Sequence, residues 1–387
     1  MGPIWHGGQA IKGLVLASGL GAAAAKLGWK GAGFNRAAWL ATAERAAEFT
    51  LRNRETSGPD AGLIHAYEND CCSALTSTQL EGLHGLTLLS NATGDRRYAD
   101  VALAATSWSL KTLMTGAGNE GLMYDGYNLT TRRFEPMVTN FVTKSGVGRP
   151  MNDDSMFLVA SRLATEPALK AKLRAAFFRV LDRLIASEGP PGNWGGYRPS
   201  TGVNGSQHPR QAFWWGRPFI DACTRTPQTP LFAFPPPLVT LSLSLCWCTD
   251  IETGNETYLG VATRSAEWYK RAQRSDGGMF RTTDASFQTT TFGQVTSGSA
   301  CAAILWIELF QVTKDPALLP DIQKALAFVG ESLVTNATDE NMRGGVIEDS
   351  VDPGKCDASP YHLRDIAASF YMQALSMLLE GAAAELT

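Results

Sequence analysis

The chain has 387 residues, of which 44% are hydrophobic and 18% are charged, a balance typical of a globular protein with a large core. The net charge is −3 and no Lys/Arg run occurs, so neither nucleic acid nor an acidic membrane surface is expected as a partner. No apolar run reaches the roughly 18 to 20 residues that a membrane-spanning helix requires. A small molecule or an oligosaccharide is the expected partner.

The N-terminal segment 11–28, IKGLVLASGLGAAAAKLG, places Lys12 before an apolar stretch that ends in small residues. This order is faintly similar to a secretory signal peptide, although a small-residue helix packed inside the fold is the simpler interpretation. Five Asn-x-Ser/Thr sequons favour a secreted glycoprotein. They begin at Asn91, Asn128, Asn204, Asn255 and Asn336.

Seven cysteines include the neighbours Cys71 and Cys72 and the pair Cys246 and Cys248. Neither pair has the Cys-x-x-Cys spacing of a zinc or redox site. We therefore expect no metal and no cofactor. An odd number of cysteines leaves at least one thiol unpaired.

Three similar stretches, 90–103, 250–263 and 310–323, each join two helical patterns. A segment of small and apolar residues precedes each stretch, and an amphipathic pattern follows it. This order predicts an inner helix followed by an outer helix. The outer patterns then lead into glycine-rich loops at 119–128, 192–199, 275–282 and 342–349, where glycine permits the left-handed turns that reverse a chain.

The repeated unit predicts an all-α (α/α)6 toroid of about six hairpins, with short β-hairpins or glycine-rich loops at its mouth. A single domain would cover residues 1–387, with residues 1–30 as an inner helix or a signal-like segment. Inner helices are expected near residues 10, 74, 152, 236, 294 and 361, and outer helices near 35, 95, 166, 255 and 318. Residues 200–237 are the least regular, because Pro and Gly interrupt them.

Two adjacent carboxylates, Asp153 and Asp154, follow Asn152 at the start of an inner helix. We expect Asn152 to cap this helix. Carboxylates in a first turn can serve the helix dipole alone. Since successive helical side chains diverge by about 100°, we expect only one aspartate to face the cavity, within reach of residues 214–217, as the essential general acid or base. The other is then structural.

A second cluster, QHPRQAFWWGRP, begins at residue 207. Tryptophan stacks on sugar rings and arginine holds carboxylates, so the cluster suits an acidic sugar, with a hydrophobic plug as the alternative. Its candidate substrate-binding residues are His208, Arg210, Trp214, Trp215 and Arg217.

Glu81 and Tyr361 are further candidates for substrate binding. Glu81 and His84 share a helical face, and a buried structural hydrogen bond is the simpler interpretation there. His362 could act as a base but is more simply a surface residue. The sequence contains no phosphate loop, Ser-His-Asp motif or nucleotide fingerprint, so phosphoryl and hydride transfer are not favoured.

The order of four motifs resembles the six-hairpin glycosidases, and within them the unsaturated glucuronyl and unsaturated rhamnogalacturonyl hydrolases. The motifs are NDDSMFLVA (152–160), WWGRP (214–218), SDGGMF (275–280) and TSGSA (296–300). Three features depart from the family pattern: Gly216 and Arg217 stand in inverted order, a second Trp is missing, and no His-Asp-x-Gly motif supplies a first catalytic aspartate.

The resemblance implies metal-free hydrolysis of an oligosaccharide that ends in an unsaturated uronic acid, with an aspartate protonating the enol ether and positioning the attacking water. A polysaccharide lyase or a sugar epimerase on the same fold is an alternative. A toroid that only binds a glycan, or that shapes a hydrophobic small molecule, is another. The sequence leaves the oligomeric state open.

Overall fold

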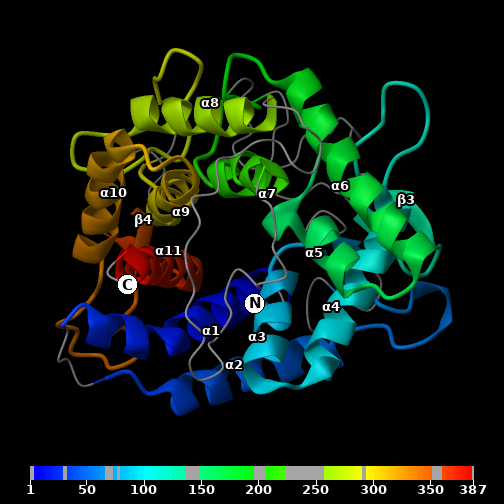
Figure 1. Cartoon of the computed structure of the whole chain (residues 1–387), viewed down its shortest axis with the longest axis horizontal. Coiled ribbons are helices and arrows are strands. Elements are labelled where there is room, and N and C mark those ends of the chain that lie inside the picture. Colours follow the sequence, from blue (N-terminus) through cyan, green and yellow to red (C-terminus); the bar gives the residue numbers. More distant parts are fainter. Residues whose placement is uncertain are drawn as a thin grey trace.

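The computed structural model describes residues 4–28, 33–65, 73–75, 79–124, 126–135, 148–195, 206–223, 257–289, 293–350 and 360–385. Its inner helices surround the middle of the molecule (Figure 1). They are α1 (Trp5–Lys26), α3 (Leu83–Thr93), α5 (Met156–Leu163), α7 (Pro218–Cys223), α9 (Thr296–Thr313) and α11 (Asp365–Glu385). Helix α11 packs against both α9 and α1, which closes the ring and confirms the predicted toroid.

A second layer of helices lies outside the first (Figure 1). These outer helices are α2 (Arg36–Arg52), α4 (Arg96–Ser109), α6 (Pro167–Ser187), α8 (Thr257–Ala272) and α10 (Leu319–Glu331). Each begins within two residues of its predicted start. The inner helices are less well predicted: α3 begins at Leu83 rather than near 74, and the start expected near 236 lies outside the described residues.

The similar stretches form the same helix-to-helix turn. In the first, Gly94 ends α3 with φ 78° and the Asp95 side chain accepts a hydrogen bond from Arg97 N at the start of α4. In the third, Lys314 ends α9 with φ 57° and Asp315 accepts from Ala317 N. A left-handed residue followed by a capping aspartate reverses the chain with few residues. The second stretch lies only partly within the described residues.

The loops that lead from outer helices to inner helices pack on the outer wall. A glycine with positive φ in each of four such loops lies so close to the backbone of the next outer helix that a Cβ atom would clash with a carbonyl oxygen. The pairs are Gly62 with Ala104, Gly121 with Arg179, Gly192 with Arg264 and Gly277 with Lys324. Glycine is therefore required at these positions both by conformation and by space.

Short strands and turns complete the described structure. Strands β1 (Ser73–Leu75), β2 (Gly126–Asn128) and β3 (Arg133–Glu135) form an antiparallel sheet, in which Ser73 pairs with Asn128 and Gly126 with Glu135. Strands β4 (Ile347–Ser350) and β5 (Tyr361–Leu363) form an antiparallel pair with a bulge. The short helical turns are η1 (Gly58–Asp60), η3 (Leu110–Thr112), η4 (Asp153–Ser155), η6 (Pro316–Leu318) and the π-turn η5 (Ala212–Gly216).

The signal-like segment forms part of inner helix α1. Helix α1 packs closely on the start of α3, because Gly8 of α1 lies against Gly82. No helix among the described residues is long and apolar enough to span a membrane. Of the sequons, Asn91 and Asn336 are exposed, Asn128 is half-buried, and Asn204 and Asn255 lie outside the described residues. Secretion and glycosylation stay predictions.

Candidate active site

The NDD stretch forms a tight turn. Asp154 (φ 51°, ψ 20°) and Ser155 (φ 52°, ψ 34°) both adopt the left-handed conformation, and α5 begins only at Met156. The prediction that Asn152 caps this helix is wrong, because the two left-handed residues separate Asn152 from the helical amides. Its Nδ2 instead donates to Phe177 O on α6, at 3.4 Å. Such a backbone is costly for residues other than glycine and is typical of functional sites.

Asp154 is completely buried and lies among cations and donors from three inner segments. Lys12 Nζ on α1 binds its Oδ1, and Arg217 Nη1 lies 3.2 Å from the same atom. Gln9 Nε2 donates to Oδ2 at 3.3 Å, and His84 Nδ1 lies 3.8 Å from Oδ1. Burial alone would raise the pKa of Asp154, but the charges of Lys12 and Arg217 outweigh burial and lower it. Asp154 is therefore an ionised carboxylate with both oxygens engaged.

Arg217 joins Asp154 to two further acids deep in the ring. Its Nε donates to Glu308 Oε1 at 2.7 Å, and its Nη2 lies 3.5 Å from Asp221 Oδ2, which also accepts from Ser155 Oγ at 2.6 Å. The aspartate that reaches the 214–217 segment is Asp154. From the sequence we expected this aspartate to be the essential general acid or base, and its engagement with cations does not favour that role. The contact is an ion pair. Because Nη1, Nη2 and Nε of Arg217 each face a carboxylate of the protein, Arg217 cannot bind a sugar acid through two parallel hydrogen bonds.

Asp153 is also completely buried, but neither of its carboxyl oxygens has a hydrogen-bond partner. Burial raises its pKa well above the usual range, and the nearby acids Glu81 and Asp154 raise it further. The adjacent aspartates thus differ in protonation, with Asp153 neutral and Asp154 charged. Neighbouring acids whose environments drive their pKa values apart are typical of acid–base catalysis.

Glu81 lies beside Asp153, two residues before α3 begins. The structural hydrogen bond expected for Glu81 stays a prediction, but its buried Oε2 has no hydrogen-bond partner. Burial raises the pKa of Glu81 to about 8, although the charges of Arg149 and Arg210 act in the opposite direction. The charge of each of two buried carboxyl groups disfavours ionisation of the other, so the loss of a proton from one makes loss from its neighbour harder. We call them the Asp153–Glu81 pair.

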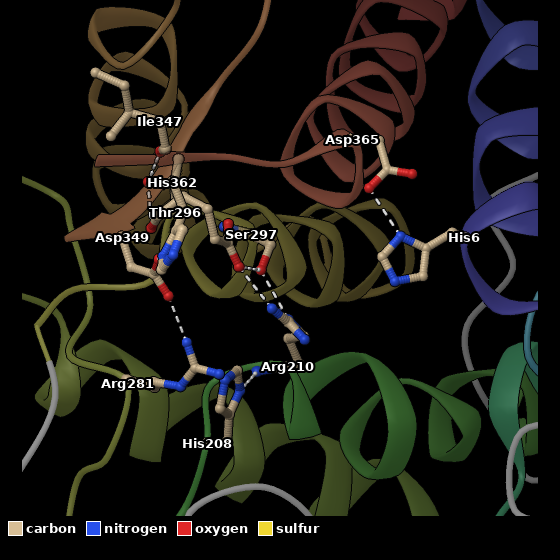
Figure 2. Close-up of polar contacts among 11 residues, drawn as sticks. His6, His208, Arg210, Arg281, Thr296, Ser297, Ile347, Asp349, His362 and Asp365 are labelled. Carbon is tan, nitrogen blue, oxygen red and sulfur yellow. Dashed lines mark hydrogen bonds and ion pairs between the residues drawn. The ribbon is translucent and has the colours of Figure 1, made fainter. Parts of the chain in front are cut away.

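His208 and Arg210 precede the π-turn. Arg210 donates from Nη2 to Glu348 Oε1 at 2.6 Å and from Nε to Ser297 Oγ at 2.7 Å. Glu348 on β4 also accepts from Ser297 N, at the start of α9, at 2.8 Å. Figure 2 shows Arg210 and Ser297 facing each other across the gap between their helices. These contacts fix Arg210 in a charge-paired position.

A parallel set of contacts lies next to this one. Arg281 Nη1 donates to Asp349 Oδ2 at 2.5 Å, and His362 Nδ1 lies 2.7 Å from Asp349 Oδ1 (Figure 2). Glu348 and Asp349, neighbours on β4, thereby hold arginines from two different segments. A third contact, His6 Nδ1 to Asp365 Oδ1 at 2.8 Å, joins the first and last inner helices (Figure 2).

The other predicted site residues differ in their surroundings. Trp214 is buried and stacks near His208, with ring centroids 6.5 Å apart. Trp215 lies in the hydrophobic core against Trp194, and its Nε1 donates to Pro150 O at 2.7 Å. Tyr361 on β5 is 39% exposed. Both tryptophans lie in the hydrophobic core, but the indole N–H of Trp214 has no hydrogen-bond partner, so substrate binding by Trp214 stays a prediction.

Several buried polar atoms near these residues lack a partner. Most buried polar groups in proteins are hydrogen-bonded, so a local concentration of unpaired ones marks a place where a ligand or water binds. Around Arg210 and the Asp153–Glu81 pair they include Trp5 Nε1, Glu81 Oε2, both carboxyl oxygens of Asp153, His208 Nε2 and Trp214 Nε1, as well as Asn152 Oδ1 and both amide atoms of Gln211. These residues come from segments that begin inner helices, so the cluster lies at one end of the ring.

Sequence reasoning missed the residues that α1 and β4 contribute. Lys12 was a clue, since a lysine inside a small-residue inner helix is rarely buried without a carboxylate partner. Surface hollows lined by described residues lie elsewhere, on the outer wall between α2 and α4. Among the described residues, Cys223 and Cys301 are buried, and no group of His, Cys, Asp and Glu is arranged to hold a metal ion.

No protein-family model matches the sequence, and no match is found among curated proteins. Solved structures do share the fold. A cellobiose 2-epimerase from Spirochaeta thermophila is 12% identical, with a TM-score of 0.59 over 97% of this chain and 86% of that enzyme.

An α-mannanase of glycoside hydrolase family 76 from Bacteroides thetaiotaomicron is 13% identical, with a TM-score of 0.58 over 96% of this chain and 86% of the other. An unsaturated glucuronyl hydrolase specific for heparin is 13% identical, with a TM-score of 0.56 over 97% and 86%. These likenesses show that the chain has the toroid fold of the six-hairpin glycosidase-like enzymes.

Proposed function

We propose that the chain is a glycoside hydrolase that cleaves an oligosaccharide with the Asp153–Glu81 pair. The observation that carries this proposal is the contrast between two adjacent aspartates. Asp154 is engaged by Lys12, Gln9 and Arg217, whereas the buried carboxyl of Asp153 has no protein partner and lies beside Glu81. A carboxylic acid kept neutral by burial is suited to protonate a leaving oxygen.

The chemistry requires the two members of the pair to differ in protonation. The pKa of Glu81 is raised to about 8, and that of Asp153 is raised well above its usual value. In the proposed reaction Glu81 is the member that ionises, because the charge of Arg210 acts on it in addition to that of Arg149, and Asp153 is the acid that donates to the glycosidic oxygen. Glu81 is then the carboxylate that activates a water molecule or attacks the anomeric carbon. The charge of Arg149, which acts on both residues, favours this singly ionised state.

The substrate class follows from two lines of support. The family resemblance and the similar heparin-specific unsaturated glucuronyl hydrolase favour an unsaturated uronic acid. Yet Arg210, Arg217 and Arg281 each already bind a carboxylate of the protein. The first substrates to test are therefore unsaturated uronic acid disaccharides, with neutral oligosaccharides, including mannosides, as the comparison.

The test is an assay for new reducing ends with these substrates. Wild-type protein should release sugar, and Asp153→Asn and Glu81→Gln should each lower kcat at least about 100-fold. Asp100→Asn, which changes an exposed carboxyl on α4, is the matched control and should retain wild-type rates. Full activity in Asp153→Asn would refute the proposal.

A second candidate is a sugar epimerase or isomerase. The similar structures include a cellobiose 2-epimerase and a D-mannose isomerase, and the buried His208 could take part in proton transfer. Reactions in D₂O separate the two functions, because epimerisation introduces solvent deuterium at carbon 2 and aldose-to-ketose isomerisation introduces it at carbon 1, whereas hydrolysis introduces deuterium at neither carbon. Activity that persists in Asp153→Asn but disappears in His208→Ala would also favour the epimerase.

A further inference from the structure

The protonation of His208 can be read from one hydrogen bond. The ring is completely buried, and its Nδ1 accepts the backbone N–H of Arg210 at 3.1 Å. A backbone amide can only donate, so Nδ1 carries no proton. Burial, with the charges of Arg210 and Arg281, lowers the pKa of His208 well below its usual value and keeps the ring neutral. The single ring proton is therefore on Nε2.

This Nε2–H group has no hydrogen-bond partner in the protein. Two buried indole N–H groups, one near the His208 ring and one near the Arg210 guanidinium group, also lack a partner. Trp214 stacks near the His208 ring, and the Trp5 ring lies 5.5 Å from the guanidinium carbon of Arg210. An indole nitrogen can only donate. Three buried groups around Arg210 thus offer hydrogens and accept none.

Charge does not dominate this region. The arginines on either side of His208 are both engaged, Arg210 by Glu348 and Arg281 by Asp349 (Figure 2). The unpaired groups are neutral N–H donors, which bind oxygen through hydrogen bonds and discriminate by geometry. Buried donors left unpaired are unfavourable, so a ligand that supplies acceptor oxygens to them gains affinity.

We propose that His208, Trp214 and Trp5 form a donor subsite that binds acceptor oxygens of the sugar, and that the Nε2–H of His208 is a specificity-determining contact rather than a catalytic base. The proposal rests on the proposed function for the nature of the ligand. The acceptor oxygen belongs either to a hydroxyl group of a neutral sugar or to the carboxylate of a uronic acid.

Two substitutions of His208 distinguish its hydrogen bond to the ligand from its hydrogen bond to Arg210 N. In His208→Gln the amide Nε2 can occupy the place of the imidazole Nε2–H. In His208→Asn the side-chain oxygen can still accept from Arg210 N, but no donor reaches the ligand. Binding of methyl glycosides of glucuronic acid, glucose and mannose is measured by calorimetry, which needs no turnover, and melting temperatures serve as the control for folding.

We expect His208→Gln to bind the preferred sugar within about threefold of wild type, and His208→Asn to bind it about tenfold more weakly at an unchanged melting temperature. Equal affinity in the two variants would overturn the proposal, whether both match wild type or both are weakened. A wild-type preference for the glucuronide would identify the carboxylate as the acceptor, and a preference for a neutral glycoside would identify a hydroxyl group.

The outcome is independent of the hydrolysis assay. If sugars bind with the expected pattern but no glycoside is cleaved, the donor subsite stands and the hydrolase proposal fails. If glycosides are cleaved and His208→Gln binds as weakly as His208→Asn, the subsite fails and the hydrolase proposal stands.

Discussion

Neutralising Asp154 should destabilise the protein far more than neutralising Asp153, although the two residues are adjacent. In Asp154→Asn, Lys12 loses the only carboxylate at hydrogen-bond distance among its described contacts, while Arg217 keeps Glu308 and Asp221. Removing one partner of a buried ion pair costs about 3 to 5 kcal/mol, because the remaining charge is left without compensation. This is a large share of the roughly 5 to 15 kcal/mol by which domains are stable.

Asp153→Asn should have the opposite profile. The carboxyl is kept neutral by burial and makes no hydrogen bond that the amide would lose. We expect its free energy of unfolding to change by less than about 1 kcal/mol. Catalytic activity should show the reverse order, with the larger loss in Asp153→Asn measured under conditions in which both variants are folded.

The assay is denaturant unfolding followed by tryptophan fluorescence, with Asp100→Asn as the exposed control. A second substitution identifies the cause of the loss. Lys12→Met in the Asp154→Asn background removes the unpaired ammonium group, and it should recover at least about 2 kcal/mol, since replacing a whole buried pair with uncharged residues is often neutral. The reasoning is refuted if Asp154→Asn is as stable as wild type, or if Lys12→Met lowers stability equally in both backgrounds.

Three further predictions concern pH and packing. The pKa of Glu81 is raised in the folded state to about 8 from about 4.5, so its contribution to stability is complete below pH 4.5 and is lost as the pH rises to about 8. The free energy of unfolding should fall over this range by at most about 1.4 kcal/mol per pH unit. Glu81→Gln should reduce this pH dependence in unfolding measured from pH 4 to 9. The value of kcat/KM should rise with pH toward about 8, as Glu81 loses its proton, and a rate that is maximal at pH 4 to 5 would contradict the assignment of Glu81 as the base. Gly192→Ala should lower the free energy of unfolding by about 1 to 3 kcal/mol, since a Cβ atom there clashes with Arg264 O and φ is 75°. At Gly94 no atom lies near the position of a Cβ atom, so Gly94→Ala should cost only the strain of its left-handed backbone.

The repeated outer helices were predictable because local chemistry sets their starts. Asp95, Glu166 and Asp315 accept hydrogen bonds from the backbone amide two residues ahead, and these residues are visible in the sequence as caps. Inner helices depend on packing instead. Helix α3 begins at Leu83 after the left-handed Gly82, which lies against Gly8 of α1, and no local pattern reveals that contact.

The contacts of the candidate site could not be predicted from the sequence, and its catalytic role stays a prediction. Sequence placed Asp153 and Asp154 at the start of an inner helix, and reasoning from helical geometry assigned them different roles. The structure gives the two aspartates different surroundings through a left-handed turn at Asp154 and Ser155, and through Lys12, which comes from a helix some 140 residues earlier. Long-range pairings of this kind leave no local pattern. The importance of Glu81 depends on its closeness to Asp153, which only the folded ring creates.

The measurement that tests the central claim most directly is the dependence of the Asp153→Asn rate on the leaving group. If Asp153 protonates the glycosidic oxygen, the loss should be at least about 100-fold for the natural type of glycoside, whose leaving alkoxide needs a proton. The loss should be much smaller for the dinitrophenyl glycoside of the same sugar, whose leaving group departs without one. An equal loss for both substrates, or no loss for either, would contradict the assignment of Asp153 as the acid.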